Sequence, residues 1–283
     1  MFQHYILTRF NLKAENWATT KNNDKALSEE WLKERFDLFE NFCFSSVKNQ
    51  VNQNFKWLVF FDTNTPEAYR QKVEEYRKSY ENFLPFFIEG MNSFLPEIIK
   101  NIQKLDSEEY VITSRLDNDD CIHERYTEVI QSYFDKQEHQ ALDIVDGYSL
   151  EIGENSRLGA YIQLNNPFMS LIEKKENLKT VWFRKRHGSW KYEKNMTRIR
   201  HQRLWLSIIH SKNMENRFLG YGNIDPKKLY EFHISKERTA EIMEDLVKAE
   251  SWDLLSFKNR INLNLKLHFK NFKTSIGLYK NKN

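Results

Sequence analysis

The sequence is poor in the residues that cross-link a chain or interrupt it. Its 283 residues include only two cysteines, Cys43 and Cys121, which offer no disulfide framework. This scarcity fits a protein that works in the reducing cytoplasm. With only 8 glycines and 5 prolines, the chain has no linker-like stretch, and we expect one large domain or two fused lobes.

Long hydrophobic runs and an excess charge of one sign are also missing. No window approaches the roughly 18 consecutive apolar residues of a membrane-spanning helix, and the first residues do not resemble a signal peptide. The 43 Lys and Arg residues nearly balance the 40 Asp and Glu residues, for a net charge of +3. This balance argues against a general nucleic-acid-binding protein.

Apolar runs alternate with helical patterns through the first half of the chain. Short apolar runs predict strands over residues 4–10, 56–62, 83–89 and 109–116. Apolar residues at steps of three and four predict helices over residues 28–51, 65–80, 93–105 and 123–136. Ser28 and Thr65 are suited to cap the first two of these helices. The alternation predicts an α/β fold with a Rossmann-like, mostly parallel sheet flanked by helices.

The second half has a mixed pattern. Residues 143–164 predict two strands joined at the turn "GENS", residues 179–186 predict another strand, and residues 197–212 predict a helix. No segment rich in Pro and Gly separates the two halves. We therefore expect the second half to belong to the same domain as the first.

Charged side chains stand at the ends of the predicted strands. Thr8 and Arg9 end the first strand, Asp62 ends the second, and Arg115 comes just before the acidic residues 117–120 at the end of the fourth. The carboxyl ends of parallel strands meet at one edge of a sheet, where ligands bind. We expect these side chains to share one rim, where Arg9 and Arg115 beside the carboxylates suggest an anion site.

The acidic segment "RLDNDD" places Asp117, Asp119 and Asp120 within four positions. Carboxylates this close repel one another unless a positive species lies among them. One candidate is a divalent metal held together with a phosphorylated substrate. The structural alternative is a solvated loop whose carboxylates favour the N-terminus of the next helix.

Two other acidic sites fit the segment less well. Asp117, Asp119 and Glu128 match three ligand positions of a calcium-binding loop, but Ile122 stands where that loop requires glycine. A glycosidase needs two carboxyl groups that face each other across a bond, whereas these are neighbours in the sequence. The metal site and the capped loop therefore stay open as the main alternatives.

The acidic segment after an apolar strand resembles the Asp-x-Asp signature of nucleotide-sugar glycosyltransferases with the GT-A fold. Four blocks, "YILTRFNL", "FKWLVFFDTNTP", "ITSRLDNDD" and "NNPFMSLIE", occur in this order and resemble the bacterial rhamnosyltransferase family over roughly residues 3–220. The resemblance implies a metal-dependent enzyme that moves a sugar from a nucleotide-sugar donor to a surface glycan, and the family's name alone suggests rhamnose as that sugar. It implies a GT-A-like fold with a nucleotide-sugar-binding half over residues 1–150 and an acceptor-side half over residues 151–250.

The resemblance also implies roles for the rim residues. Asp119 would ligate Mn²⁺ or Mg²⁺ directly, Asp117 would touch the ribose or the metal, and Asp120 would lie behind the ion or share it. Thr8, Arg9, Asp62 and Arg115 would hold the nucleotide part of the donor, with Asp62 accepting a hydrogen bond from a pyrimidine N–H.

A further metal ligand and a base are expected from the second half. His187 is the first candidate for the ligand, ahead of His201 and His210. The base motif of the larger GT-A family is not visible, and Glu173, which we expect on a helix, is the best candidate for the base.

The remaining expectations concern the acceptor. Trp182, Trp190 and Trp205 suggest a platform for a glycan or a lipid-linked glycan, with core packing as the alternative. Residues 184–203 carry eight Lys or Arg and one acid, so they are a second anion-binding candidate.

The basic tail, residues 251–283, has seven Lys or Arg and no acid from Ser256 onward. Apolar residues from Ile261 to Ile276 recur at helical steps, although the segment 261–269 also alternates as a strand would. A basic amphipathic helix favours an anionic membrane surface, which suggests peripheral contact with the inner membrane face. The alternative is a solvated helix packed on the core.

Two other function classes remain open at this point. A metal-dependent phosphohydrolase would also use a rim of carboxylates with basic partners. A non-catalytic protein that binds nucleotides or glycans would bind its ligand with an affinity indifferent to metal. A transferase differs from both because it needs an acceptor and a donor together.

Overall fold

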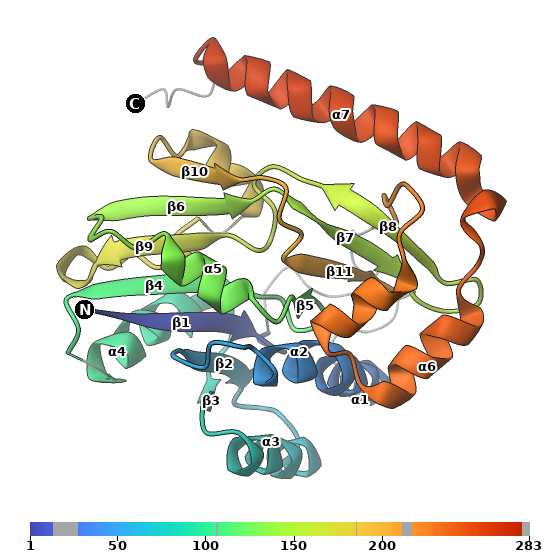
Figure 1. Ribbon diagram of the computed structural model, residues 1–283. Helices are drawn as coiled ribbons and strands as arrows, with labels where there is room; N and C mark the ends of the chain where they lie inside the picture. The colour runs from blue at the N-terminus through green and yellow to red at the C-terminus, as the bar shows by residue number, and fades with distance from the viewer. Residues whose placement is uncertain (14–27, 106, 185, 211–216, 279–283) are drawn as a thin grey trace.

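The structure is a computed structural model that describes residues 1–13, 28–105, 107–184, 186–210 and 217–278. A seven-stranded sheet forms its centre, in the order β10-β6-β9-β4-β1-β2-β3 (Figure 1). Its strands are β1 (Phe2–Arg9), β2 (Lys56–Asp62), β3 (Phe83–Ile88), β4 (Tyr110–Arg115), β6 (His139–Ile144), β9 (Ser170–Lys174) and β10 (Met196–Ile199). Of these seven strands, only β9 runs against its neighbours. The predicted α/β fold with a mostly parallel sheet is therefore confirmed.

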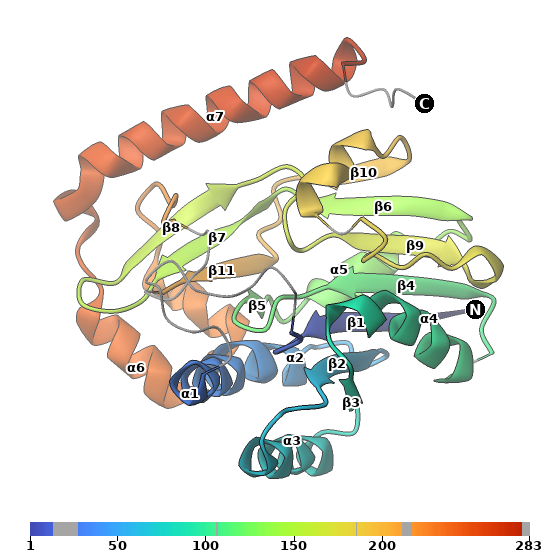
Figure 2. The same cartoon turned by 180° about the vertical axis from the view of Figure 1, so that it is seen from behind.

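A smaller sheet stands beside the carboxyl end of the first, in the order β5-β11-β7-β8 (Figure 2). Its strands are β5 (Cys121–Ile122), β7 (Asp146–Glu151), β8 (Arg157–Ile162) and β11 (Trp205–Ile209). The pair β7 and β8, joined by the turn at residues 153–156, is the hairpin that the sequence predicted. The second half of the chain thus supplies strands to both sheets, which makes it part of the same structure. The residue boundaries at 150 and 250 stay predictions.

Helices cover both faces of the central sheet. A continuous helical segment runs through α1 (Glu29–Leu38), a π-helical turn η1 (Phe39–Phe44) and α2 (Ser45–Lys48). With α3 (Glu67–Ser79) and α5 (Tyr126–Ser132), it packs on the face that contains Ile6. Helix α4 (Phe94–Leu105) packs on the opposite face, which contains Tyr5 and Leu7. Alternate residues of β1 therefore belong to different hydrophobic layers, as a strand buried on both sides requires.

The capping predictions have different outcomes. Ser28 caps α1, and its side chain accepts a hydrogen bond from the backbone N–H of Trp31. The prediction that Thr65 caps α3 is wrong, because the Thr65 hydroxyl donates instead to the Asp62 carbonyl at 2.7 Å. Pro66 occupies the cap position without a side-chain hydrogen bond.

The strand predicted over residues 179–186 does not form. The backbone N–H groups of Lys179 and Thr180 donate to the Glu173 carboxylate at 3.0 and 2.7 Å, and that of Val181 donates to the Thr113 hydroxyl at 2.8 Å. These side-chain acceptors take the place of a neighbouring strand. Thr180 also has a φ of 66°, in the left-handed region that interrupts a strand.

The helix predicted over residues 197–212 is wrong as well. The segment instead forms β10, which pairs with β6, and β11, which pairs with β7. His201 separates these strands with a φ of 65°. Ile199, Trp205 and Ile208 fit a pleated, buried position as well as they fit a helix stripe, and the neighbouring strands decide between the two. Strand β6 was not predicted as a separate element.

The remaining helical elements come mostly from the second half of the chain. They are the short η4 (His187–Tyr192), α6 (Lys236–Asp245) and the long α7 (Asp253–Ser275); the other short turns are η2 (Met91–Ser93), η3 (Lys175–Asn177), η5 (Pro226–Phe232) and η6 (Ala249–Trp252). In both views α7 lies across β8 and near β10 (Figures 1 and 2). The predicted helix of the tail is confirmed, whereas Lys280 and Lys282 fall outside the described residues.

Helix α7 buries one narrow stripe and exposes another. Leu263 and Leu267 are buried against the body of the protein, while the predicted stripe from Ile261 to Ile276 faces outward. Among the helices that the structure describes, none has the length and apolar character needed to cross a bilayer.

Candidate active site at the carboxyl end of the sheet

The carboxyl ends of β1, β2 and β4 form one rim, as the sequence predicted. Leu7 pairs with Arg115, and Arg9 pairs with Phe60 two residues before Asp62. The rim side chains differ in what they can offer. Thr8 is fully buried, and its hydroxyl accepts a hydrogen bond from the Trp57 indole at 2.9 Å. Thr8 therefore belongs to the core beneath the rim.

Asp119 sits in a buried charge cluster. Its Oδ2 accepts a hydrogen bond from Arg35 at 2.6 Å and lies 3.2 Å from Nε2 of His210. Burial by itself opposes ionisation, but the charges of Arg35 and His210 outweigh it and hold the pKa of Asp119 well below its ordinary value. Asp119 is therefore ionised at neutral pH, fixed between a residue of α1 and a residue after β11.

Asp117 has its own arginine. Both of its carboxylate oxygens accept from the same nitrogen of Arg115 at 3.1 Å. The Arg115 guanidinium lies 4.1 Å from the ring centre of Trp182, and Arg9 approaches the same ring at 5.2 Å. The Asp117 side chain is 25% exposed, so it is the acid of the segment that a ligand can reach. Arginines, in this structure, are the positive species that the clustered carboxylates require.

Asp120 faces the smaller sheet. It is 3% exposed, and its Oδ1 accepts a hydrogen bond from the backbone N–H of Ile208 at 2.9 Å. Burial, together with the charges of Asp119 and Asp117, raises the pKa of Asp120 well above its ordinary value. Asp120 thus ties the acidic loop to β11, and its expected place behind or beside a metal ion stays a prediction.

Asp62 also makes contacts within the protein. Its carboxylate accepts from the backbone N–H of Lys13 at 3.1 Å and from the backbone N–H and side chain of Asn64 at 2.9 and 3.0 Å. It is 4% exposed. These contacts fix the loops that follow β1 and β2. The role of Asp62 in holding a pyrimidine remains a prediction.

Two predicted residues lie away from the acidic loop. Glu173 is on β9, not on a helix, and pairs with Val111 near the start of β4, whereas the acidic loop follows the end of β4. Its buried carboxylate accepts the two backbone N–H groups described above. Glu173 thus lies toward the end of the strands opposite to the acidic loop, which removes the geometric basis for predicting it as the base.

His187 is held by the chain after β8. Its Nδ1 is 2.9 Å from the Asn165 carbonyl, and burial lowers its pKa. His210, a second choice in the sequence, is the histidine that contacts Asp119. His201 lies elsewhere, with its backbone N–H bound to Asp146. The geometry therefore favours His210 over His187 as a ligand beside the acidic loop.

The three tryptophans do not form a platform. Trp190 and Trp205 are almost fully buried, and Trp205 stacks on Phe168 at 4.9 Å. Trp182 is 3% exposed and supports the two arginines. The core-packing alternative is correct for Trp190 and Trp205.

Arg35 is the residue that the sequence reasoning missed. It lies on α1, far from the rim in the sequence, and is 9% exposed. Its Nη1 also donates to the Asn118 side chain at 3.1 Å. The available signal was its spacing, because Arg35 follows Leu32 by three residues and so shares the buried face of the helix. A cation on an apolar face requires a buried acidic partner.

The side chains fit a divalent metal in part. Within the described ranges, no group of three or more His, Cys, Asp and Glu side chains is arranged to hold an ion. Asp119 and His210 nevertheless present an oxygen and a nitrogen 3.2 Å apart, a spacing that two ligands of one octahedral ion can take. Mg²⁺ commonly uses one or two carboxylates and completes its shell with substrate phosphates and water. The donor set is therefore compatible with an ion that binds together with a diphosphate.

Comparison with known proteins finds both a family and distant structures. Residues 3–220 match the family described as "Putative rhamnosyl transferase". No curated protein matches the chain. The S. aureus TarS 1-349 structure aligns over 73% of this chain and 60% of that chain, with 14% identity and a TM-score of 0.41. The same TarS fragment in complex with UDP aligns over 86% of this chain and 70% of that one, with 11% identity and a TM-score of 0.43.

A third structure has a similar extent of alignment. The "putative nucleotide-diphospho-sugar transferase" from Desulfovibrio desulfuricans G20 aligns over 88% of this chain and 100% of that chain, with 10% identity and a TM-score of 0.37. This chain spans less than two thirds of the first TarS structure. The family assignment depends on none of these structures, because the match to the family covers most of the sequence. The chain therefore belongs to the rhamnosyl transferase family, a family of glycosyltransferases.

Proposed function

We propose that this protein transfers a sugar from a nucleotide-sugar donor to a glycan acceptor, and that the donor diphosphate binds at the acidic loop. One observation carries the proposal: Arg9, Arg35 and Arg115 gather around this loop at the carboxyl rim of a parallel sheet. Asp120 is turned toward β11, so these three guanidinium groups outnumber the two carboxylates beside them, Asp117 and Asp119. The excess positive charge favours an anionic ligand.

The chemistry follows from this charge. As the bond between sugar and diphosphate breaks, negative charge develops on the leaving diphosphate. Arg115 is fixed on Trp182 and Arg35 is fixed by Asp119 and Asn118, so neither must reorganise to meet that charge. Asp117, the more exposed acid, is placed to touch the donor. A divalent ion, Mn²⁺ or Mg²⁺, would be held by Asp119 and His210 with Asp117 nearby, and would neutralise the diphosphate further.

The test compares donor binding and transfer in Asp119→Asn with wild type. Thermal stability is measured with UDP-, dTDP- and GDP-sugars, with and without Mn²⁺, because a ligand stabilises the folded state in proportion to its occupancy. One donor should raise the melting temperature of wild type. In Asp119→Asn the rate of transfer to an acceptor should fall at least about tenfold. The part of the melting-temperature rise that depends on Mn²⁺ should fall at least as much. Asp135→Asn, at an exposed acid, is the matched control and should behave as wild type.

The same experiment separates the other function classes. Release of phosphate from simple phosphoesters without any acceptor would identify a phosphohydrolase. Donor binding without transfer to any glycan, and without dependence on metal, would identify a binding protein. Transfer by Asp119→Asn at the wild-type rate would overturn the proposed site.

We also propose that α7 contacts an anionic membrane surface, where a lipid-linked acceptor would be presented. Large apolar side chains stand exposed along its length: Leu254, Phe257, Ile261, Leu265, Phe269, Phe272 and Ile276. An apolar stripe of this size is unusual on a water-exposed surface. Lys258, Arg260, Lys266, Lys270 and Lys273 lie on the same helix. Each basic residue close to an anionic surface contributes about 1 kcal/mol.

A further inference from the structure

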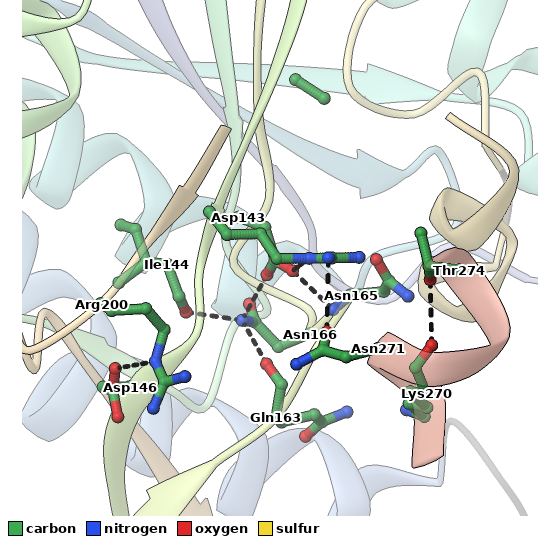
Figure 3. Close-up of polar contacts among 12 residues, drawn as sticks. Asp143, Ile144, Asp146, Gln163, Asn165, Asn166, Arg200, Lys270, Asn271 and Thr274 are labelled. Carbon is green, nitrogen blue, oxygen red and sulfur yellow. Dashed lines mark hydrogen bonds and ion pairs between the residues drawn. The ribbon is translucent and has the colours of Figure 1, made fainter. Parts of the chain in front are cut away.

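A cavity of about 220 Å³ lies between α7 and the loop that follows β8. Lys270 and Thr274 line it from the helix, while Gln163 and Asn165 line it from the loop (Figure 3). A water molecule occupies about 30 Å³ in the liquid, so the cavity has room for a ligand of several heavy atoms. Of the residues predicted for the donor and metal site only His187 lines it, whereas Lys191 and Arg198 belong to the segment 184–203 that was predicted to bind anions.

The cavity is positively charged. Lys191, Arg198 and Lys270 line the cavity, and none of its described lining residues is acidic. Desolvation lowers the pKa of Lys270, the charge of Asp143 opposes this shift, and the neighbouring cations add to it. An anion that entered the cavity would relieve this repulsion.

The carboxylate nearest to the cavity is turned inward. Asp143 is fully buried and accepts from the backbone N–H of Asn165 at 2.9 Å and from the Asn166 side chain at 3.0 Å. Nε of Arg198 is 3.9 Å from Asp143, a weak contact for an ion pair. Burial raises the pKa of Asp143 to about 6, and Asp143 is a single acid beside the three cations that line the cavity.

Two buried polar atoms of the residues that line the cavity have no hydrogen-bond partner within the described residues. Asn165 is 5% exposed, and its Oδ1 accepts no hydrogen bond; the buried Nε of Arg198 likewise donates none. Asn165 is fixed by its backbone contacts with Asp143 and His187 and has a φ of 54°. Leaving a buried polar atom without a hydrogen bond costs about 1–3 kcal/mol, a cost that a polar ligand can remove. The free acceptor fits a hydroxyl group, and the free donor fits an anion.

A second cavity of about 180 Å³ adjoins the first and shares Gln163, Leu164 and Lys270 with it. Its remaining wall is mostly apolar and includes Ile162, Leu219, Leu263 and Leu267. The two cavities together offer a cationic end and an apolar end along α7. This combination suits an amphipathic ligand.

The cationic cavity is also close to the acidic loop. His187 lines the cavity, and the charges of Asp117 and Arg115 both act on its pKa. Its Nδ1 contact with the Asn165 carbonyl joins η4 to the loop that forms the wall of the cavity. A ligand held here would stand beside a donor held at the acidic loop.

We propose that the cavity under α7 binds a glycosyl phosphate, with the phosphate at Arg198 and Lys270 and a sugar hydroxyl at Asn165. This ligand can be a soluble sugar phosphate or the head of a lipid-linked glycan. Calling it the acceptor rests on the proposed transferase activity. The binding of the glycosyl phosphate does not rest on that activity, because the cations and the atoms without a hydrogen-bond partner belong to the cavity alone.

The experiment measures binding without donor or metal, so failure of the transferase proposal would leave it interpretable. Glucose 1-phosphate is titrated into wild type, Arg198→Gln, Lys270→Gln and Lys273→Gln by calorimetry. Lys273→Gln is the matched control, because it removes the same charge from the same helix outside the cavity. We expect Arg198→Gln and Lys270→Gln to weaken binding at least tenfold and the control less than twofold.

Further arms identify the phosphate, the sugar and the source. Inorganic phosphate should bind at least fivefold more weakly than glucose 1-phosphate, and Asn165→Ala should remove that difference. Vesicles containing phosphatidylinositol present a phosphate joined to a polyhydroxylated ring on a lipid. Weaker vesicle binding by Lys270→Gln than by Lys273→Gln would assign the lipid-linked ligand. Equal vesicle binding by the two variants, together with weaker binding of glucose 1-phosphate by Lys270→Gln in calorimetry, would assign the soluble sugar phosphate. Equal glucose 1-phosphate binding by all four proteins would overturn the site.

Discussion

The three carboxyl groups of the acidic loop can lie close together in the folded protein because each is accommodated in a different way. Asp119 is paired with Arg35, Asp117 is paired with Arg115, and the pKa of Asp120 is raised. The first pair is buried, with 10% and 13% of the two side chains exposed. A buried pair contributes little by comparison with apolar residues of the same volume, but removing one partner leaves an uncompensated charge.

Arg35→Met should therefore destabilise the protein by about 3–5 kcal/mol at pH 7. The loss should be smaller at pH 4, because Asp119 without its arginine can take up a proton there. Urea unfolding followed by circular dichroism at both pH values measures these effects. Arg77→Ala breaks an exposed ion pair with Glu74 and should leave the stability unchanged within error. An Arg35→Met loss that is equal at both pH values would contradict the assignment of the charge.

Asp143 should give the protein a distinct dependence on pH. Its carboxyl ionises near 3.8 in the ordinary state and near 6 when buried in the fold, so the folded state holds more protons between these values. Stability should therefore fall as the pH rises from about 4 to about 6, by roughly 3 kcal/mol for a shift of two pKa units. Asp143→Asn cannot ionise and should lack this decrease. Parallel stability curves for the two proteins over this range would refute the prediction.

Among the elements, α7 has the clearest division between two faces. The sequence pattern predicted a helix with one docked and one free face, but it could not say which stripe docks. Leu263 and Leu267 meet β8 and the loop after it, because Leu267 packs with Val145, Ile162 and Leu164. The larger stripe faces outward, although it holds more apolar surface. The helical spacing of the apolar residues predicts the element, whereas the contacts with β8 and the loop after it decide which stripe is buried.

Replacing Leu265, Phe269 and Phe272 with Ser should weaken binding to phosphatidylglycerol vesicles at least tenfold. These side chains are 58–63% exposed, so their removal should not destabilise the fold. Co-sedimentation at low salt measures the binding. The control replaces Val51 and Tyr230, which are similarly exposed but lie elsewhere. Equal loss in both proteins, or no binding by wild type, would remove the membrane proposal and leave α7 as a solvated helix.

Over the whole molecule, the first half was easier to predict from sequence than the second. Each parallel strand of the first half is followed by its own helix, so local periodicity and order along the chain agree. The shared rim of Arg9, Asp62 and Asp117 followed from that order alone. In the second half, β10 and β11 pair with strands formed some 55 residues earlier in the chain, and nothing in their local pattern announces those partners.

The site was predictable to the same extent. The positions of the acidic residues came from a contiguous motif, but their partners Arg35 and His210 are 84 and 91 residues away from Asp119. Glu173 illustrates the reverse error. A lone acid near a familiar block was read as a candidate base, whereas in the fold it accepts two backbone N–H groups. The sequence alone does not distinguish a glutamate that accepts backbone hydrogen bonds in a turn from a glutamate that acts as a base.

The long reach of these contacts bears on how the protein is made. The last partners of the acidic loop, Ile208 and His210, are 88 and 91 residues beyond the acids that they contact. At synthesis rates of 5–20 residues per second, the ribosome needs roughly 5–20 seconds to supply them. During that interval the nascent first half can form its parallel strands and bind Arg35 to Asp119, yet Asp120 has no β11 to anchor it. Translation that stops before β11 therefore leaves Asp119 without His210 and Asp120 without the backbone N–H of Ile208, so the acidic loop of such a chain is incompletely held.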